Sequence, residues 1–140
     1  MTPRFATLLV AGFALMPMAC RDDNARKTTF AVTGKVTLDG KPAEHATVVL
    51  HPVGESGPDV VKPRGTVKTD GTFTLTTYAG DDGAPAGDYR VTVELWLAGP
   101  RADEPPSNRL SVKLAKPETS QLTAKVAAAP TNLETIALKR

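Results

Sequence analysis

The side chains that most often carry out catalysis are scarce in this sequence. It contains two histidines, His45 and His51, and a single cysteine, Cys20. A zinc site needs three or four converging ligands, and no serine lies in the G-x-S-x-G pattern of a nucleophile elbow. We therefore expect a protein that is not an enzyme and that uses no metal ion or other cofactor.

Three aspartates are the strongest candidates for a cation site. Asp81 and Asp82 precede a glycine, and Asp88 follows a few residues later. Carboxylate oxygens are ligands that Ca²⁺ prefers, although the spacing here differs from that of an EF-hand loop. The alternative interpretation, which we favour, is a solvated turn. Calcium binding is the weaker of the two hypotheses.

Two aromatic side chains are candidates for a ligand surface. Within the predicted strand 88–97, Trp96 has the same parity as Thr92, which predicts that both face solvent, whereas Leu97 is expected to face inward. Tyr78 also has outward parity on its own predicted strand. If these strands lie in one sheet, the two rings form a platform for a sugar or a peptide. The alternative is that the proline-rich segment after the strand covers Trp96.

The N-terminus has the features of an export signal. Arg4 precedes the almost unbroken apolar run Phe5–Met16, which is too short to cross a bilayer as a helix. A charged start, a short apolar stretch and a small residue before the cut are typical of a secretory signal peptide. Cys20 follows Ala19 at the end of this segment, and a lone cysteine in an exported protein cannot form an internal disulfide.

The surroundings of Cys20 resemble the lipobox of bacterial lipoproteins, although Pro17 stands where the lipobox usually has leucine. The resemblance implies that the thiol is acylated, with palmitate among the expected chains, and that Cys20 becomes the first residue of the mature protein. Several acyl chains hold a protein durably on a membrane. Aspartate is absent directly after Cys20, which favours the outer membrane. The alternative is ordinary signal cleavage with an incidental cysteine.

These features divide the chain into three parts. We expect residues 1–19 to be the signal peptide, residues 20–29 the lipidated cysteine and a polar tether, and residues 30–140 one folded domain. The 17 basic and 15 acidic side chains are mixed and form no basic stripe, so nucleic-acid binding is not expected. The expected partners are the membrane and an envelope protein or glycan.

The pattern of the mature part predicts an all-β fold. Between Phe30 and Leu38, apolar residues alternate with polar ones, which is typical of a strand with one buried face. Aspartate-glycine pairs such as Asp70-Gly71 mark turns between strands. Strands are predicted over residues 30–38, 46–52, 65–69, 73–77, 88–97, 110–114, 121–127 and 133–138. Seven or eight short strands of this kind favour a two-sheet Greek-key sandwich.

Three stretches resemble the motifs of the carboxypeptidase regulatory-like domain. They are G-x-V-x-x-D-G-K-P at Gly34–Pro42, T-D-G-x-F at Thr69–Phe73, and P-x-G-x-Y-x-V-x-V at Pro85–Val93. The resemblance implies a prealbumin-like, transthyretin-type sandwich in which Phe73 and Tyr89 occupy core or corner positions. These motifs carry no catalytic group. Since no catalytic domain accompanies them, the resemblance implies a stand-alone accessory or binding module.

The sequence thus favours a lipid-anchored, non-catalytic binding or assembly module at the bacterial cell envelope. The alternatives are a structural envelope component without a specific ligand and a carbohydrate-binding accessory module. A mechanical role, through an isopeptide bond between Lys35 and Asn132, is disfavoured because Lys35 alternates onto the solvent face.

Overall fold

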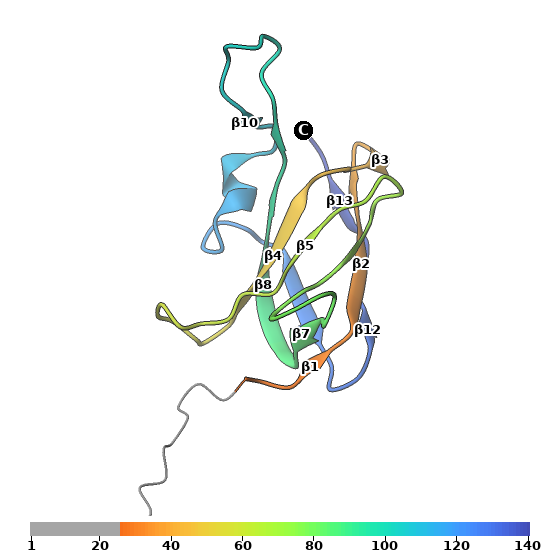
Figure 1. The fold of residues 1–140 in the computed structure, drawn as a ribbon, viewed down its shortest axis with the longest axis vertical. Coiled ribbons are helices and arrows are strands. Elements are labelled where there is room, and N and C mark those ends of the chain that lie inside the picture. The colour runs from red at the N-terminus through yellow and green to blue at the C-terminus, as the bar shows by residue number, and fades with distance from the viewer. Residues whose placement is uncertain (1–25) are drawn as a thin grey trace, which may run out of the picture.

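The computed structural model describes residues 26–140, so Cys20 and the expected signal peptide lie outside the described residues. The regular structure of this part is almost entirely strand (Figure 1). A single 3-10 helix, η1, comprises Val112–Ala115. The strands are β1 (Thr29–Phe30), β2 (Val32–Leu38), β3 (Lys41–Pro42), β4 (Thr47–Pro52), β5 (Arg64–Thr66), β6 (Thr72–Thr74), β7 (Ala84–Pro85), β8 (Gly87–Glu94), β9 (Trp96–Leu97), β10 (Ser107–Asn108), β11 (Thr123–Val126), β12 (Thr131–Asn132) and β13 (Ile136–Leu138).

Two sheets form the body of the domain, and the expected all-β sandwich is confirmed. One sheet has four antiparallel strands in the order β11-β8-β4-β5. In the other, β2 is the central strand: β3 and β6 pair with it antiparallel, while β12 and β13 pair with it in parallel. The chain passes back and forth between the sheets, so each sheet contains strands from distant parts of the sequence.

Alternating side chains from both sheets fill the core. In β2, every second residue from Val32 to Leu38 is buried, as the sequence predicts, and Lys35 is exposed. Gly34 leaves room for the ring of Phe73, since a Cβ at this glycine would lie 2.5 Å from the ring Cζ. The other large buried side chains come mainly from β4, β6 and β8 and the residues beside them: Val48, Leu50, Val67, Leu75, Val91 and Val93.

The predicted edge strand over residues 110–114 is wrong. Residues of this segment form η1 instead, and the Oγ of Ser111 accepts the N–H of Lys113 at the start of the turn. Helix η1 packs against β8. Thr92 of β8, expected to face solvent, is only 4% exposed. The outer face of the four-stranded sheet is therefore partly covered, which local alternation does not reveal.

The long strand predicted over residues 88–97 is divided in the structure. Its sheet pairing ends at Glu94, and the Oδ1 of Asn108 accepts the N–H of Leu95 at 3.0 Å and that of Leu110 at 3.1 Å. Strand β9 then pairs with β10, away from both sheets. We call β9, β10 and the loop 98–106 the distal ribbon. Leu97, expected to face inward, is 38% exposed because the ribbon has no second layer beneath it.

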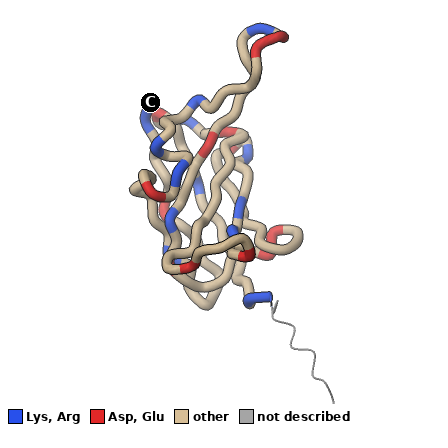
Figure 2. Tube along the Cα trace, turned by 90° about the vertical axis from the view of Figure 1, so that its left-hand side faces the viewer, with Lys and Arg blue, Asp and Glu red and all other residues tan. Residues whose placement is uncertain are grey.

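Charge is distributed over the whole described surface. Figure 2 shows lysine and arginine interspersed with aspartate and glutamate, including at the tip of the distal ribbon. Among the described residues, no helix has the length and apolar character needed to span a membrane.

Candidate binding surfaces

Trp96 is exposed on the distal ribbon, as its parity predicts. Its side chain is 56% exposed, and its Nε1–H donates to Oε2 of Glu94 at 3.1 Å. In the ribbon register it lies opposite Asn108, so the proline-rich segment pairs beside Trp96 without covering it. The hydrogen bond fixes the indole at one edge and leaves the ring available for contact.

Tyr78 does not join Trp96. Its hydroxyl accepts the backbone N–H of Lys27 at 2.9 Å, and the guanidinium of Arg26 lies 5.4 Å from its ring centroid. These contacts are made with the first described residues, beside β1 and β7, at the end of the sandwich opposite the distal ribbon (Figure 1). The expected aromatic platform is therefore wrong, because its two rings lie at opposite ends of β8.

Asp82 organises a loop with its carboxylate. Its oxygens accept the backbone N–H groups of Thr77, Tyr78 and Ala79 over distances of 2.7 to 3.3 Å. Burial alone raises the pKa of Asp82, but these hydrogen bonds outweigh it and hold the pKa below its usual value. Thr77, the last residue of the strand predicted over residues 73–77, is half-buried, and its hydroxyl donates to the carbonyl of Gly83. The solvated-turn interpretation fits this arrangement.

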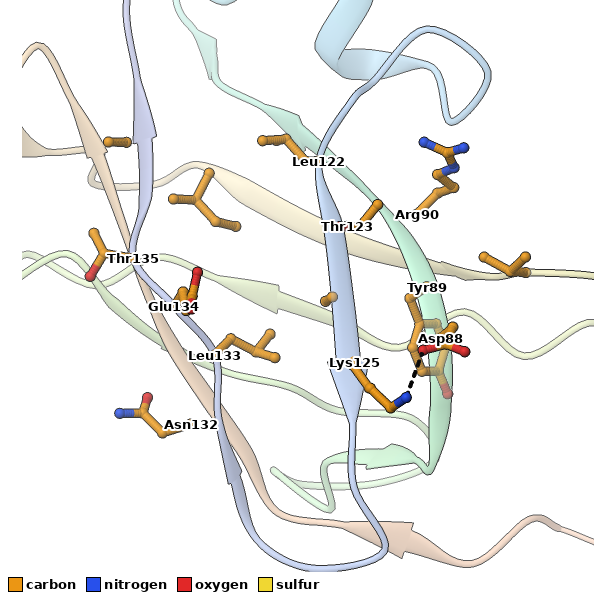
Figure 3. A pocket seen from close by; sticks show the side chains of 14 residues that line it. Asp88, Tyr89, Arg90, Leu122, Thr123, Lys125, Asn132, Leu133, Glu134 and Thr135 are labelled. Carbon is orange, nitrogen blue, oxygen red and sulfur yellow. Dashed lines mark ion pairs between the residues drawn. The ribbon is translucent and has the colours of Figure 1, made fainter.

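The other two aspartates of the calcium hypothesis lie apart. Asp81 is exposed, and its N–H donates to the Oγ1 of Thr76. Asp88 is on β8, where its Oδ1 lies 3.8 Å from Nζ of Lys125 (Figure 3). Within residues 26–140, no three histidine, cysteine, aspartate or glutamate side chains are grouped as a metal site requires. The structure thus does not bring Asp81, Asp82 and Asp88 together.

The two histidines are also separated. His45 is exposed in a turn with φ of 68°, and its Nε2 lies 3.4 Å from Oε1 of Glu44. His51 lies on the outer face of β4, where its Nε2 is 3.0 Å from Oγ1 of Thr92. Lys35 and Asn132, between which an isopeptide bond was disfavoured, do not contact one another. Lys35 is exposed, and the Oδ1 of Asn132 accepts a hydrogen bond from the hydroxyl of Thr33.

A groove of about 720 Å³ lies between β11 and the segment 132–137 (Figure 3). Strand β11 is at the edge of the four-stranded sheet, and β12 and β13 are at an edge of the other sheet. The two sheets are therefore open to one another along this side. The half-buried side chains of Leu122, Leu133 and Ile136 line it and pack against the core. The buried hydroxyl of Tyr89 donates to the carbonyl of Pro85 at 2.7 Å. Neither Trp96 nor Tyr78 lines this groove.

Comparison with known proteins gives distant likenesses only. No protein-family model and no curated protein matches the sequence. A solved structure from Pseudomonas aeruginosa, of a protein proposed to bind carbohydrate, is 13% identical; the match covers 81% of this chain and 90% of that chain with a TM-score of 0.40. A 9R-lipoxygenase from Cyanothece is 15% identical over 79% of this chain and 16% of that chain, with a TM-score of 0.42. Similarity at this level carries no functional conclusion.

Proposed function

We propose that this chain is a lipid-anchored, non-catalytic binding module at the bacterial cell envelope, and that the distal ribbon is its contact surface. The anchor is acylated Cys20. Of the expected tether 20–29, the residues before Arg26 link the anchor to the domain, since Lys27 contacts Tyr78 and Thr29 belongs to β1. The β-sandwich positions the ribbon and takes part in no chemistry. In this proposal the domain is a relative of the carboxypeptidase regulatory-like domain.

The single observation that supports this function best is the exposure of Trp96. Removing a large apolar side chain from water is favourable, so a ring that is 56% exposed on a two-stranded ribbon contributes little to folding. Tryptophan is among the residues most often found at the centre of a binding interface. The bond to Glu94 holds the indole in one orientation, which reduces the entropy lost on binding.

The position of the ribbon fits a tethered module. The described chain begins beside β1 and β7, and β8 starts at the same end of the sandwich. Eight residues of β8 extend about 26 Å before the ribbon begins. A tether attached at the N-terminal end therefore leaves Trp96 on the side facing away from the attachment point.

A carbohydrate partner is the second candidate, and the pairing of Trp96 with Glu94 favours it. A sugar presents an apolar face of C–H groups, which packs on a planar ring, and hydroxyl groups, which donate to a carboxylate. Glu94 uses Oε2 for the indole, and Oε1 has no hydrogen-bond partner among the described residues. One ring and one adjacent acceptor thus suit a sugar as well as a peptide.

The proposal is tested by recovering envelope proteins and glycans on the purified protein and on two variants. Trp96→Ala is expected to reduce recovery of the partner about thirtyfold, the loss typical of a central tryptophan. Val112→Ala is the matched control, because Val112 is 69% exposed on η1 and lies outside the ribbon and both hollows described here. Recovery of one stoichiometric partner, lost only in Trp96→Ala, supports a binding module. Broad association that is equal in all three proteins would instead favour a structural component.

The anchor is tested separately by replacing Cys20 with serine. The variant cannot be acylated at this position, so we expect the protein to move from the membrane fraction to the soluble envelope fraction. Unchanged recovery in the membrane fraction would contradict lipidation at Cys20 while leaving the role of the distal ribbon open to its own test.

A further inference from the structure

A second hollow, of about 440 Å³, lies on the outer face of the four-stranded sheet. We call it the His51 pocket. Its floor contains His51 of β4 and Arg90 of β8, and its walls come from the loop 53–62 and from Pro117 and Glu118. It shares no residue with the distal ribbon. Arg90 and Trp96 are six residues apart along one extended segment, which corresponds to about 20 Å.

The floor of the pocket places two nitrogen-rich side chains next to one another. His51 and Arg90 are directly opposite in the antiparallel register of β4 and β8, so their side chains project from the same face. Lys62 reaches the same pocket from the end of the loop. Side chains with nitrogen donors from three different parts of the sequence therefore line one pocket.

The cations of this pocket are not neutralised within the described chain. Neither Arg90 nor Lys62 forms an ion pair or a side-chain hydrogen bond with another residue of the range 26–140. Glu55 also lines the pocket, but its carboxylate is paired with Nζ of Lys27. Glu118 is the remaining carboxylate, so two full positive charges face one negative charge.

The contact between His51 and Thr92 assigns the tautomer of the imidazole. Thr92 is 4% exposed, and its hydroxyl has no acceptor among the described residues other than Nε2 of His51, 3.0 Å away. A buried hydroxyl that donated to nothing would cost free energy. Thr92 therefore donates to Nε2, and the hydrogen of the neutral ring is on Nδ1. Burial lowers the pKa of His51 and the charge of Lys62 lowers it further, while Glu118 raises it.

We infer that the His51 pocket binds an oxyanion of the phosphate type, held by the guanidinium of Arg90, the ammonium of Lys62 and the Nδ1–H of His51. Arginine matches two oxygens of such a group with parallel N–H donors, and lysine adds a compact positive charge. No bond is made or broken in this step. The inference goes beyond the proposed function, because it concerns a different surface and does not need Trp96.

Two kinds of molecule at an envelope carry such an oxyanion: a free phosphorylated or carboxylated solute, and an anionic lipid with its headgroup. Glu55 at the rim of the pocket is paired with Lys27, so the pocket lies at the end where the described chain begins. If Cys20 is acylated as proposed, this end is the one nearer to the membrane. Only the headgroup source depends on the proposed anchor.

The test uses the Cys20→Ser protein, so that an acyl chain does not itself partition into vesicles. Inorganic phosphate is titrated at low ionic strength, against chloride at matched ionic strength, by calorimetry and by NMR of the His51 ring. Vesicles of phosphatidylcholine, with and without phosphatidylglycerol, supply the headgroup. The double variant R90Q/K62Q removes both cations. The double variant R64Q/K68Q is the matched control, because Arg64 and Lys68 lie outside the pocket.

We expect saturable phosphate binding with a Kd of about 1 mM, accompanied by a shift of the His51 resonances. R90Q/K62Q should weaken it about tenfold, and the control should bind like the parent. Glu118→Gln should strengthen binding about threefold, because it removes the opposing charge. If the natural ligand is a lipid headgroup, the variants should rank in the same order of affinity for phosphatidylglycerol vesicles as for phosphate.

The inference is overturned if R90Q/K62Q matches its parent on both phosphate and phosphatidylglycerol vesicles. Phosphate binding that Trp96→Ala leaves intact, alongside loss of the envelope partner, separates this pocket from the distal ribbon. The NMR shift on phosphate titration is read on the unmodified pocket, so this part of the result does not depend on how well any variant folds.

Discussion

Replacing Tyr89 with phenylalanine tests the packing at the start of β8. The Tyr89 side chain is 4% exposed, and its hydroxyl donates to the carbonyl of Pro85 at 2.7 Å. The variant keeps the ring and leaves a buried acceptor without a donor. Such a loss costs about 1.5 kcal/mol in the free energy of unfolding at neutral pH. For a domain of this size the melting temperature should fall by about 5 °C.

The loss of unfolding free energy caused by Tyr89→Phe should disappear and then change sign at alkaline pH. Burial raises the pKa of Tyr89 to about 12, with smaller contributions from the charges of Glu55 and Tyr78. A group whose pKa is raised by folding stabilises the native state fully below the unfolded pKa of about 10, and this stabilisation is lost as the pH rises from 10 to 12. The full loss is about 3 kcal/mol. Phenylalanine has no proton to lose, so the two proteins should become equally stable near pH 11.

The measurement is urea unfolding of the wild type and of Tyr89→Phe between pH 7.5 and 11.5. Tyr78→Phe is the control for loss of a hydroxyl at a half-buried site, where the oxygen only accepts from Lys27. Parallel stability curves for wild type and Tyr89→Phe across this range would refute the reasoning. So would a Tyr89→Phe protein as stable as the wild type at pH 7.5.

Four further outcomes follow from the described contacts. Gly34→Ala should cost about 2 kcal/mol of unfolding free energy, because the new Cβ would lie 2.5 Å from the ring of Phe73; urea midpoints check this, and an unchanged midpoint contradicts it. Asp82→Ala should lower the melting temperature equally in calcium and in EDTA, since three backbone N–H groups lose their acceptor; a loss confined to calcium would restore the metal hypothesis. The lowered pKa of His51 means that the native state favours the neutral ring. The contribution of His51 to the free energy of unfolding is therefore present above pH 6.5 and is lost as the pH falls below that value. His51→Gln should make the melting temperature less dependent on pH in this acidic range. Trp96 fluorescence should be red-shifted and readily quenched by acrylamide, whereas a blue, protected emission would contradict its exposure.

Features that depend on near neighbours in the sequence are predictable here. Alternation over β2 identifies its buried face, and Asp70-Gly71 marks a turn that the structure contains, with Gly71 at a φ of 85°. Trp96 is exposed as its parity predicts, but Leu97 beside it is exposed as well, so parity does not separate the two faces of the distal ribbon. Local pattern was sufficient wherever a residue's environment is set by its own strand.

Features that depend on distant segments were not predictable. Leu110, Val112 and Leu114 alternate like a strand, yet Val112 and Leu114 lie in η1, which packs against β8. Leu97 fits an inward parity, but the side chain of Asn108 binds the N–H of Leu95 and ends the sheet pairing there. The His51 pocket needs the register of β4 against β8 and the path of a loop, neither of which leaves a sequence signal.

The parallel pairing of β13 with β2 has a mechanical consequence. Val36 pairs with Ile136 and Leu38 with Leu138, so both strands run in the same direction, and Arg140 lies beside Asp39 at the end where β2 finishes. A force that pulls Lys27 and Arg140 apart therefore acts along these strands in opposite senses and shears them. In shear the hydrogen bonds between two strands resist together, whereas peeling breaks them one by one. A domain held at its N-terminal end and pulled from the other should resist extension more strongly than its modest size suggests.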